Sequence, residues 1–254
     1  MEVIAFTNQK GGVGKTTTAV NLASAMDRLS RRVLCIDLDP QGNLTANFGV
    51  HTKNNATTYE ILTGEKSVLE CIRNTPFSGI SLIPAFINLA NVDLEIANKI
   101  SRESLLKEAI EKDREELTKR FDYVFIDCSP SLGLLSINAL TASDSVLIPV
   151  DCGIFALDGM AHLVEIISVV KKRLNTKLEI KGVLMTKVND STNISKEVLE
   201  ALLDQFGKML FKTKINQNVT IADAQASNLP IDRFNQKARG AEQHLALAKE
   251  ILGI

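Results

Sequence analysis

The stretch KGGVGKTT, which spans Lys10–Thr17, decides the fold of this chain. It follows a short apolar run, Val3–Thr7, and opens a segment with helical periodicity, Lys15–Leu29. A glycine-rich turn between a strand and a helix presents backbone N–H groups and a helix N-terminus to phosphate oxygens. The stretch ends as the P-loop pattern G-x-x-x-x-G-K-[ST] ends, although Gln9 stands at the position of the first glycine. The sequence therefore predicts a phosphate-binding loop.

The residue types in the loop predict what each one does. Glycines let the backbone approach phosphates closely, and Lys15 is expected to reach the β- and γ-phosphates. Thr16 is expected to supply a hydroxyl to Mg²⁺, and Thr17 can contact the α-phosphate. We therefore expect ATP and Mg²⁺ as cofactors, bound by Lys10, Gly11, Gly12, Val13, Gly14, Lys15, Thr16 and Thr17.

Lys10 is a second cation placed just before the glycines. An ordinary P-loop has no lysine there, and this one could reach a nucleotide held by a neighbouring subunit. The alternative is a lysine that is merely solvated. The functional interpretation predicts a dimer, because the extra charge would act across a subunit interface.

Acidic residues end two of the apolar runs. Asp37 and Asp39 follow the second run and lie on the same side of an extended segment. Asp127 ends the run Tyr123–Ile126, which is a Walker B pattern that places a carboxylate near Mg²⁺. Taken alone, the first pair could be a plain turn at Asp-Pro. With the loop upstream, we expect Thr16, Asp37 and Asp127 at the metal.

Short β-rich runs alternate with longer helical patterns, which indicates βαβ units. The fold class expected is α/β, a doubly wound, mostly parallel sheet flanked by helices, in a single domain over residues 1–254. Strands are expected at Val3–Thr7, Arg32–Asp37, Ile80–Ile83, Tyr123–Asp127, Ser145–Pro149, Ile180–Thr186 and Met209–Lys212. Helices are expected at Lys15–Leu29, Thr58–Leu62, Ser101–Lys119, Leu132–Thr141, Ala156–Leu174, Ile194–Phe206, Thr220–Ala226 and Ala238–Ile251. The polar segment Asn47–Thr75 is expected to be a mobile insertion.

Composition excludes several classes of protein. The net charge of −1 argues against a protein that coats nucleic acid with its whole surface. Four cysteines without C-x-x-C spacing indicate reduced, buried thiols and neither a disulfide framework nor a zinc site. No run is long and apolar enough for a membrane span, and no signal peptide is evident. These features favour a cytoplasmic protein.

The chain resembles the ParA/Soj partition ATPases, members of the ParA/MinD superfamily with a deviant Walker A motif. The lysine before the glycines carries the resemblance, together with DLDPQGN at Asp37–Asn43 and the D-x-x-P-x-x-G pattern at Asp127–Gly133. It extends to IPVDCGIFALDGM at Ile148–Met160, GVLMTKVNDSTN at Gly182–Asn193 and ARGAEQHLALAKEIL at Ala238–Leu252.

This resemblance implies roles for particular residues. Two monomers would sandwich two ATP molecules, with Lys10 neutralising phosphate charge on the partner's nucleotide. Asp37 would lie near the Mg²⁺ shell, and Asp39 would position the attacking water. The catalytic residues implied are Lys10, Lys15 and Asp39.

The resemblance also implies adenine and ribose contacts from two loops. One follows the strand that ends near Thr186, and the other corresponds to the I-P-R-N segment of the family, here Ile215–Asn218. The candidate base contacts are Asn189, Asn216 and Asn218, and Asn216 stands where the family has proline.

Departures from the family concern DNA binding. Ser191, Gln217 and Thr220 replace arginines with which typical members bind DNA nonspecifically. Basic residues remain at Lys171–Arg173 and at the candidate DNA contacts Lys208, Lys212, Lys214, Lys237 and Arg239, although these could also be ordinary solvated side chains.

The leading hypothesis is a partition ATPase that forms a homodimer with ATP, binds nucleoid DNA and is stimulated by a ParB-like partner. The same cycle could distribute a protein cargo. A MinD-like membrane-cycling regulator would need a basic amphipathic helix at the C-terminus, and Lys249–Ile254 disfavours it. A further alternative is a metabolic member, such as an iron–sulfur reductase or a ligase of the dethiobiotin-synthetase kind. An iron–sulfur dimer would need cysteines that face the symmetry axis, and neither Cys128 nor Cys152 lies where that family places its ligands, so both are expected to be packing residues.

Overall fold

The computed structural model describes residues 1–50, 56–153, 156–157 and 159–254. Within them, seven strands form one sheet in the order β3-β4-β2-β5-β1-β6-β7. All neighbours pair in parallel except β3 and β4, which are antiparallel. The strands are β1 (Glu2–Phe6), β2 (Val33–Leu38), β3 (Arg73–Asn74), β4 (Ile80–Ile83), β5 (Tyr123–Cys128), β6 (Ser145–Asp151) and β7 (Glu179–Thr186). The predicted doubly wound, mostly parallel sheet is confirmed.

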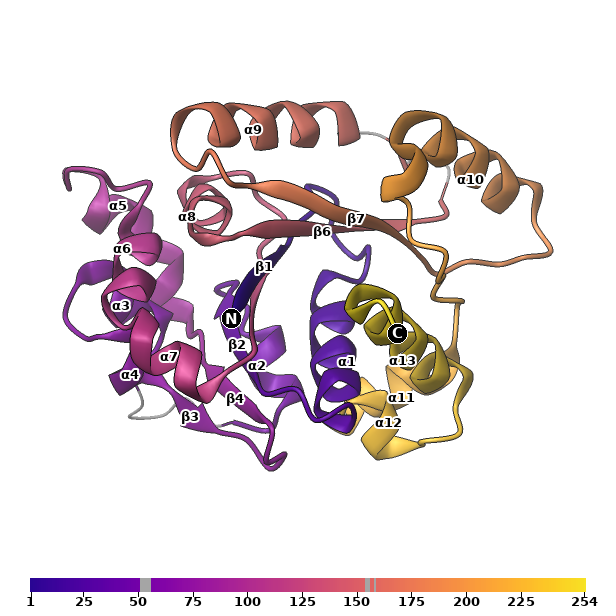
Figure 1. The fold of residues 1–254 in the computed structure, drawn as a ribbon, viewed down its shortest axis with the longest axis horizontal. Helices are drawn as coiled ribbons and strands as arrows, with labels where there is room; N and C mark the ends of the chain where they lie inside the picture. The colour runs from indigo at the N-terminus through magenta and orange to yellow at the C-terminus, as the bar shows by residue number, and fades with distance from the viewer. Residues whose placement is uncertain (51–55, 154–155, 158) are drawn as a thin grey trace.

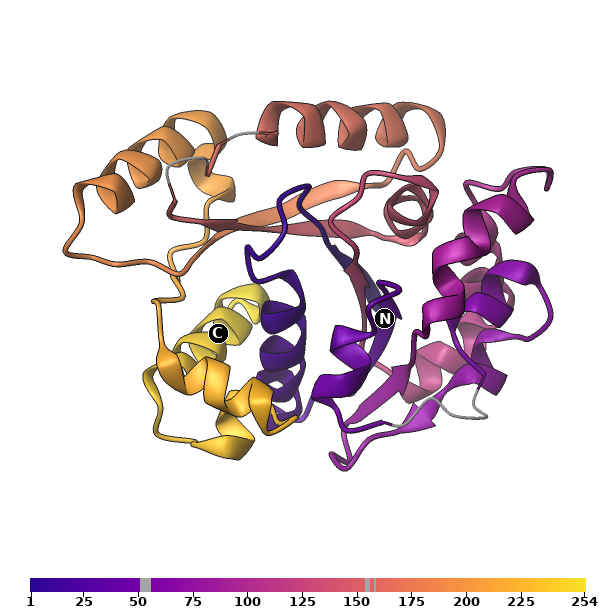
Figure 2. The same ribbon diagram turned by 180° about the vertical axis from the view of Figure 1, so that it is seen from behind.

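Helices cover both faces of this sheet, as the two opposite views show (Figures 1 and 2). The first half of the chain contributes α1 (Lys15–Arg28), α2 (Asn43–Asn47), α3 (Thr58–Thr63), α4 (Val68–Cys71), η1 (Ile87–Asn91), α5 (Val92–Ile96), α6 (Leu105–Lys112) and α7 (Arg114–Arg120). The second half contributes α8 (Leu134–Ala142), α9 (Met160–Arg173), α10 (Asn193–Phe206), η2 (Gly207–Met209), α11 (Val219–Ala226), α12 (Ile231–Phe234) and α13 (Arg239–Leu252).

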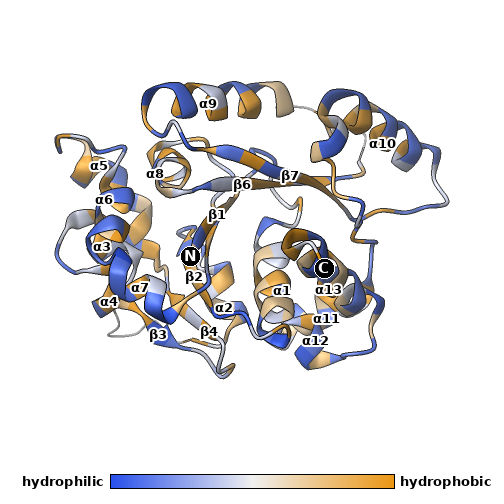
Figure 3. Ribbon diagram, viewed as in Figure 1, coloured by the Kyte–Doolittle hydropathy of each residue, from blue (hydrophilic) through white to orange (hydrophobic). Residues whose placement is uncertain are grey.

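Alternation along the strands explains the two layers. Val3 and Ala5 of β1 face a core shared with α3, α6 and α8, whereas Ile4 and Phe6 face a core shared with α1 and α13. A third cluster lies between β6, β7, α9 and α10. Strands that are apolar on both faces are expected in a parallel sheet covered twice, and Figure 3 shows hydrophobic residues along the central strands.

The helix α13 packs against α1, side by side in both views (Figures 1 and 2). Leu247 and Ala248 are fully buried in that contact. The helix that begins at the phosphate loop is therefore braced by the last helix of the chain. None of the helices in the described residues is both long and apolar enough to span a membrane.

Two expected elements are wrong. Met209–Lys212 is not a strand, since Met209 ends η2 and only one isolated bridge, Val183 to Leu210, joins this segment to β7. The helix expected over Ser101–Lys119 is broken into α6 and α7 at Asp113, whose carboxylate accepts a hydrogen bond from the Leu69 N–H at 3.1 Å.

Other expectations need smaller corrections. The helix expected from Ala156 begins at Met160, and residues 154, 155 and 158 lie outside the described residues. The segment Asn47–Thr75, expected to be a mobile insertion, forms α3 and α4 in its described part, each starting with a capping box. Residues 51–55 of that segment lie outside the described residues.

Candidate active site

The glycine loop between β1 and α1 is tied to the two strands on its far side. The Thr186 hydroxyl donates to the Val13 carbonyl at 2.7 Å, which joins the loop to the end of β7. The Asn8 amide donates to the Pro149 carbonyl at 2.7 Å, which joins it to β6. Gly14 has φ 91°, a left-handed conformation that favours glycine. These contacts hold the loop at the carboxyl edge of the sheet, where ligands bind in such folds.

A pocket of about 930 Å³ opens over this loop. Of the predicted site residues, Gly11, Gly12, Gly14, Lys15, Thr16, Thr17, Asp39, Asn216 and Asn218 line it. Lys10, Val13, Asp37, Asp127 and Asn189 lie outside this lining. The structure thus brings the phosphate loop, the aspartate loop after β2 and the segment after η2 around one cavity.

Lys15 lies at the base of the pocket. Its ammonium donates to the carbonyls of Asn8 and Lys10 at 3.0 and 3.2 Å. Burial lowers the pKa of this lysine, and the nearby Asp127 opposes that shift. Phosphate oxygens in the pocket would place negative charge beside the ammonium and so stabilise its charged form against the effect of burial.

The aspartates at the ends of β2 and β5 lie side by side, because Asp37 and Asp127 are paired in the parallel ladder. Both are fully buried. Burial raises the pKa of Asp37 to about 6. Burial, with a contribution from Asp37, raises the pKa of Asp127 well above its usual range. This pair of carboxylates therefore needs a positive charge to stay ionised together.

The two carboxylates differ in the hydrogen bonds they already make. Asp37 accepts from the Asp39 N–H at 3.1 Å and from the N–H and hydroxyl of Thr45 at 2.8 and 2.6 Å. Among the residues that the structure describes, Asp127 accepts only from the Thr16 hydroxyl at 2.6 Å, and its other oxygen is buried without a partner. Asp127 is thus the better metal-facing oxygen donor, and Asp37 holds the turn into α2.

Thr16 and Asp127 fit a hard divalent cation. Mg²⁺ prefers oxygen ligands and is commonly held by one or two protein oxygens, with waters and substrate phosphates completing its shell. No group of three or more His, Cys, Asp or Glu side chains suited to a metal occurs in the described part of the chain. The site therefore fits Mg²⁺ that arrives with a nucleotide.

Asp39 lies on the pocket wall and is 8% exposed. One of its oxygens accepts from the Gln41 N–H at 3.0 Å, which fixes the direction of the carboxylate. This places a preoriented acceptor on the same cavity as Lys15 and Thr16.

Lys10 is not among the residues that line the pocket. Its ammonium donates to both oxygens of Asp151 at 2.9 and 3.2 Å, and the lysine side chain is 31% exposed. Asp151 ends β6, so the pair spans the loop and the far strand. The extra lysine is consequently held at the surface of the monomer.

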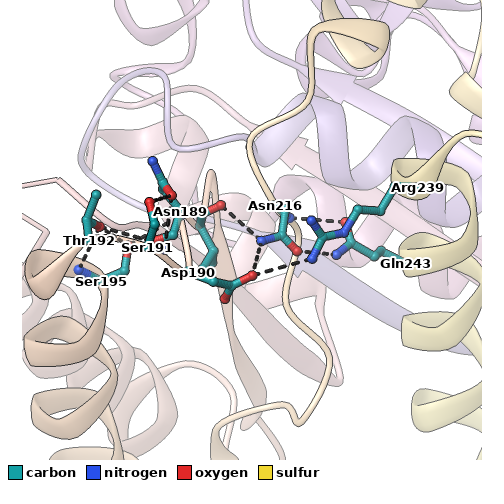
Figure 4. Close-up of polar contacts among 9 residues, drawn as sticks. Asn189, Asp190, Ser191, Thr192, Ser195, Asn216, Arg239 and Gln243 are labelled. Atoms are coloured by element: carbon teal, nitrogen blue, oxygen red, sulfur yellow. Dashed lines mark hydrogen bonds and ion pairs between the residues drawn. The ribbon is translucent and has the colours of Figure 1, made fainter.

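The three asparagines expected at the base all make hydrogen bonds within the protein, and Figure 4 shows those of Asn189 and Asn216. Asn189 accepts from the N–H and hydroxyl of Ser191. Asn218 caps α11 by accepting from the Thr220 N–H. Asn216 bonds to Asp190 and Gln243. Asn216 and Asn218 line the pocket, whereas Asn189 does not.

The candidate DNA contacts are exposed, except that Lys214 is partly buried. Arg239 lies 3.4 Å from Asp190, and both side chains are more than half exposed. An ion pair with that exposure is weak. Its guanidinium can therefore exchange to another anion at little cost.

Several residues of the site were not predicted from sequence. Asp151, Gln225 and His244 come from distant segments: Asp151 holds Lys10, Gln225 donates to the Thr17 hydroxyl at 2.8 Å, and His244 lines the pocket. None has a local sequence signal. Lys187 and Asn228 also line it, with φ of 51° and 54°, and such backbone strain is frequent at functional sites.

His244 is 1% exposed, its Nδ1 lies 2.7 Å from the Gly240 carbonyl, and its Nε2 has no partner. Burial lowers its pKa to about 4, against smaller opposing effects of the Gly240 carbonyl and of Asp232. Between pH 6.5 and 4 the unfolded chain therefore binds a proton that the folded chain does not, so this histidine destabilises the fold as the pH falls.

We expect His244→Leu to remove this acid sensitivity. Between pH 7 and pH 4.5, the free energy of unfolding of the wild type should fall by about 2–3 kcal/mol more than that of the variant. Urea denaturation of both proteins at the two pH values measures the difference. An offset that stays constant between the two pH values would contradict the expectation.

A glycine loop that opens a helix, beside a threonine hydroxyl bonded to a buried aspartate, is how P-loop nucleoside triphosphatases hold a triphosphate and its Mg²⁺. The fold and the site define a protein of that class. Comparison with known proteins identifies the family within this class. A family model described as an AAA domain matches residues 1–180.

The chain is 44% identical to the sporulation initiation inhibitor protein Soj of Bacillus subtilis, covering 98% of each protein. It is 38% identical to the chromosome partitioning protein ParA of Myxococcus xanthus, covering 98% of this chain and 87% of that one. Cobyrinic acid a,c-diamide synthase from Mycobacterium smegmatis, solved with an ATP analogue and magnesium, is 33% identical with a TM-score of 0.85, covering 99% and 94%. The chain belongs to the ParA/Soj family of ATPases.

Proposed function

We propose that this protein is an ATP-dependent dimerising switch for chromosome or plasmid partition. The observation that carries the proposal is the placement of Lys10, which lies beside the glycine loop but is turned out of its own pocket onto Asp151. A charged group that is not used by its own site is available to the site of a second copy. The similarity to Soj and ParA proteins over nearly the whole chain supports this reading.

Within one subunit, the described residues divide the work of binding Mg²⁺ and ATP. The loop N–H groups and Lys15 neutralise the phosphates, and Thr16 with Asp127 holds Mg²⁺. Mg²⁺ supplies Lewis-acid charge to the terminal phosphate when bound. Asp39 orients the attacking water, because its carboxylate is fixed on the pocket wall.

Lys10 completes the site in the homodimer. It leaves Asp151 and places its ammonium on the triphosphate of the partner subunit, where charge develops during phosphoryl transfer. A cation supplied in trans is worth about 10³–10⁵ in rate in related systems. Hydrolysis is thereby tied to the dimer, and the dimer to ATP.

We further propose that the ATP dimer binds nucleoid DNA without sequence preference and that a ParB-like partner stimulates hydrolysis and releases it. Exposed basic residues at Lys208, Lys212, Lys237 and Arg239 support this, together with the partly buried Lys214. A dimer doubles every such contact, and nonspecific binding needs a Kd of only about 10⁻⁴–10⁻⁶ M.

The same switch acting on a protein cargo remains an alternative. A MinD-like membrane cycle is disfavoured by α13, whose apolar face is buried against α1. An iron–sulfur role is disfavoured by Cys128 and Cys152, since both are buried and burial raises the pKa of each thiol. The diamide synthase shares the fold, but its identity of 33% is below the 44% of Soj.

DNA binding across a salt series tests the proposal. With ATP, the protein should bind duplex DNA of arbitrary sequence, and log affinity should fall linearly with log salt. With ADP or no nucleotide, binding should be at least about tenfold weaker at the same salt, because the monomer presents half of the basic contacts. Fluorescence anisotropy with labelled DNA measures both.

Binding that is equal in all three nucleotide states would contradict the switch. Binding that ignores salt would contradict phosphate recognition. ATP-dependent dimerisation without any DNA binding would contradict the proposed binding to nucleoid DNA.

A further inference from the structure

The segment after η2 forms the wall of the pocket opposite the phosphate loop. The Ile215 N–H donates to the Met185 carbonyl at 2.9 Å, and the Val188 N–H donates back to the Ile215 carbonyl at 3.0 Å. The Gln217 N–H then donates to the Val188 carbonyl at 3.0 Å. The segment therefore runs beside the chain that leaves β7, and its own N–H at position 216 points outward from this pairing.

Asn216 connects that wall to α13 (Figure 4). Its side-chain amide donates to the Val188 carbonyl at 3.1 Å and to Asp190 Oδ2 at 2.8 Å. Its side-chain oxygen accepts from Gln243 Nε2, and its backbone N–H donates to Gln243 Oε1 at 3.1 Å. Asn216 is 7% exposed, so each of these bonds replaces water.

This set of contacts has only one consistent orientation. Both N–H bonds of the Asn216 amide point at acceptors, the Val188 carbonyl and the Asp190 carboxylate. The amide cannot be flipped, because its oxygen would then face both of them. Gln243 must therefore present its own N–H₂ to the Asn216 oxygen and its own oxygen to the Asn216 N–H.

We propose that Gln243 is a positioning residue for nucleotide binding: it locks Asn216, and through it the wall of the pocket on which the base lies. The inference rests on the proposed function, which puts ATP in this pocket. Gln243 does not line the pocket, so it acts through Asn216. Because α13 also packs on α1, one helix positions both the phosphate end and the base end of the site.

The replacement of the family's proline fits this role. A proline at position 216 would hold the backbone by its ring, without any hydrogen bond. Among the described residues, the Asn216 N–H donates to Gln243 and takes no part in the pairing with the chain that leaves β7, so a proline at this position would not break that pairing.

Gln243→Glu tests the proposal in the full-length protein. The carboxylate keeps the acceptor for the Asn216 N–H but sets an oxygen against the Asn216 oxygen. We expect the Kd for a non-hydrolysable ATP analogue with Mg²⁺, and the KM for ATP, to rise about tenfold, the size of one lost buried contact. The kcat at saturating ATP should stay within about twofold, because no reacting group is moved.

Two further variants make the test specific. Gln205→Glu, on the exposed face of α10, introduces the same charge change away from the wall and should leave the Kd unchanged. Asn216→Pro removes both partners of Gln243. In that background Gln243→Glu should have no further effect on the Kd, which is the signature of an interaction between the two positions.

The outcomes separate this inference from the proposed function. An unchanged Kd and KM in Gln243→Glu, or a loss in kcat alone, would overturn the positioning role while ATP binding by the wild type still stands. Equal losses from Gln243→Glu with and without Asn216→Pro would also overturn it. Failure of the wild type to bind the analogue would refute the proposed function itself, and the positioning role with it.

Discussion

Replacing Lys10 by alanine is expected to lower stimulated ATP hydrolysis about 10³-fold while ATP binding stays within about threefold of the wild type. The physical reason is that Lys10 lies outside the lining of its own pocket and holds Asp151 instead, whereas Lys15 lies inside the pocket. Under the proposed function, the variant lacks a cation only at the transition state in the partner subunit's site. Steady-state turnover with DNA and the stimulating partner measures the rate, and equilibrium binding of a nucleotide analogue measures affinity.

The matched control is Lys177→Ala, which removes an exposed lysine far from the loop and should leave turnover unchanged. Turnover of Lys10→Ala at the wild-type level would contradict a cation in trans. A large loss of ATP affinity would show that Lys10 serves its own pocket, which is also contrary to the proposal.

The central strands could be predicted because local and global signals agree in them. β2, Val33–Leu38, is buried at every position, and its first four residues, Val33–Ile36, form an unbroken apolar run in the sequence. The helix α1 could be predicted for a similar reason, since it follows directly from the glycine loop. Where the hydrophobic pattern, the length of the run and the flanking turns all indicate the same element, the local preference agrees with the tertiary structure and the prediction is right.

The elements that were wrong depend on contacts between distant segments. The break between α6 and α7 occurs where Asp113 bonds to the Leu69 N–H, a contact that no helical pattern shows. The run Met209–Lys212 has strand composition, but it meets β7 in a single isolated bridge at Leu210, with one hydrogen bond from the Phe211 N–H to the Val183 carbonyl at 3.0 Å. Apolar runs of this length do not separate a strand from a covered connection.

The residues of the candidate site also fall into two groups, those within one sequence motif and those from distant segments. Lys15, Thr16 and the loop glycines are contiguous in sequence, so one motif predicted them together. Asp151 and Gln243 act on Lys10 and Asn216 from 141 and 27 residues away, and no spacing rule joins such pairs. The resemblance also led to Asn189 as a base contact; its side-chain oxygen accepts from Ser191 in its own loop, and the contact to the base stays a prediction.

Replacing Asp39 by alanine should trap the protein as an ATP dimer and lower turnover by at least about 10²-fold, the usual contribution of a positioned base. Asp39 lies on the pocket wall with one oxygen fixed by the Gln41 N–H, and it makes no contact with Lys15, Thr16 or the Asp127 pair among the hydrogen bonds of the described residues. Its removal therefore spares the groups that bind phosphate and Mg²⁺, so binding and dimerisation survive while the water loses its orientation.

Size-exclusion chromatography with ATP and Mg²⁺ should show a persistent dimer for the variant and a return to monomer for the wild type as ATP is consumed. Gln41→Ala, which keeps the Gln41 N–H and hence the bond to Asp39, is the matched control and should return to monomer like the wild type. A variant that elutes only as monomer with ATP would mean that Asp39 helps to build the dimer, and the assignment of the attacking water to it would be wrong.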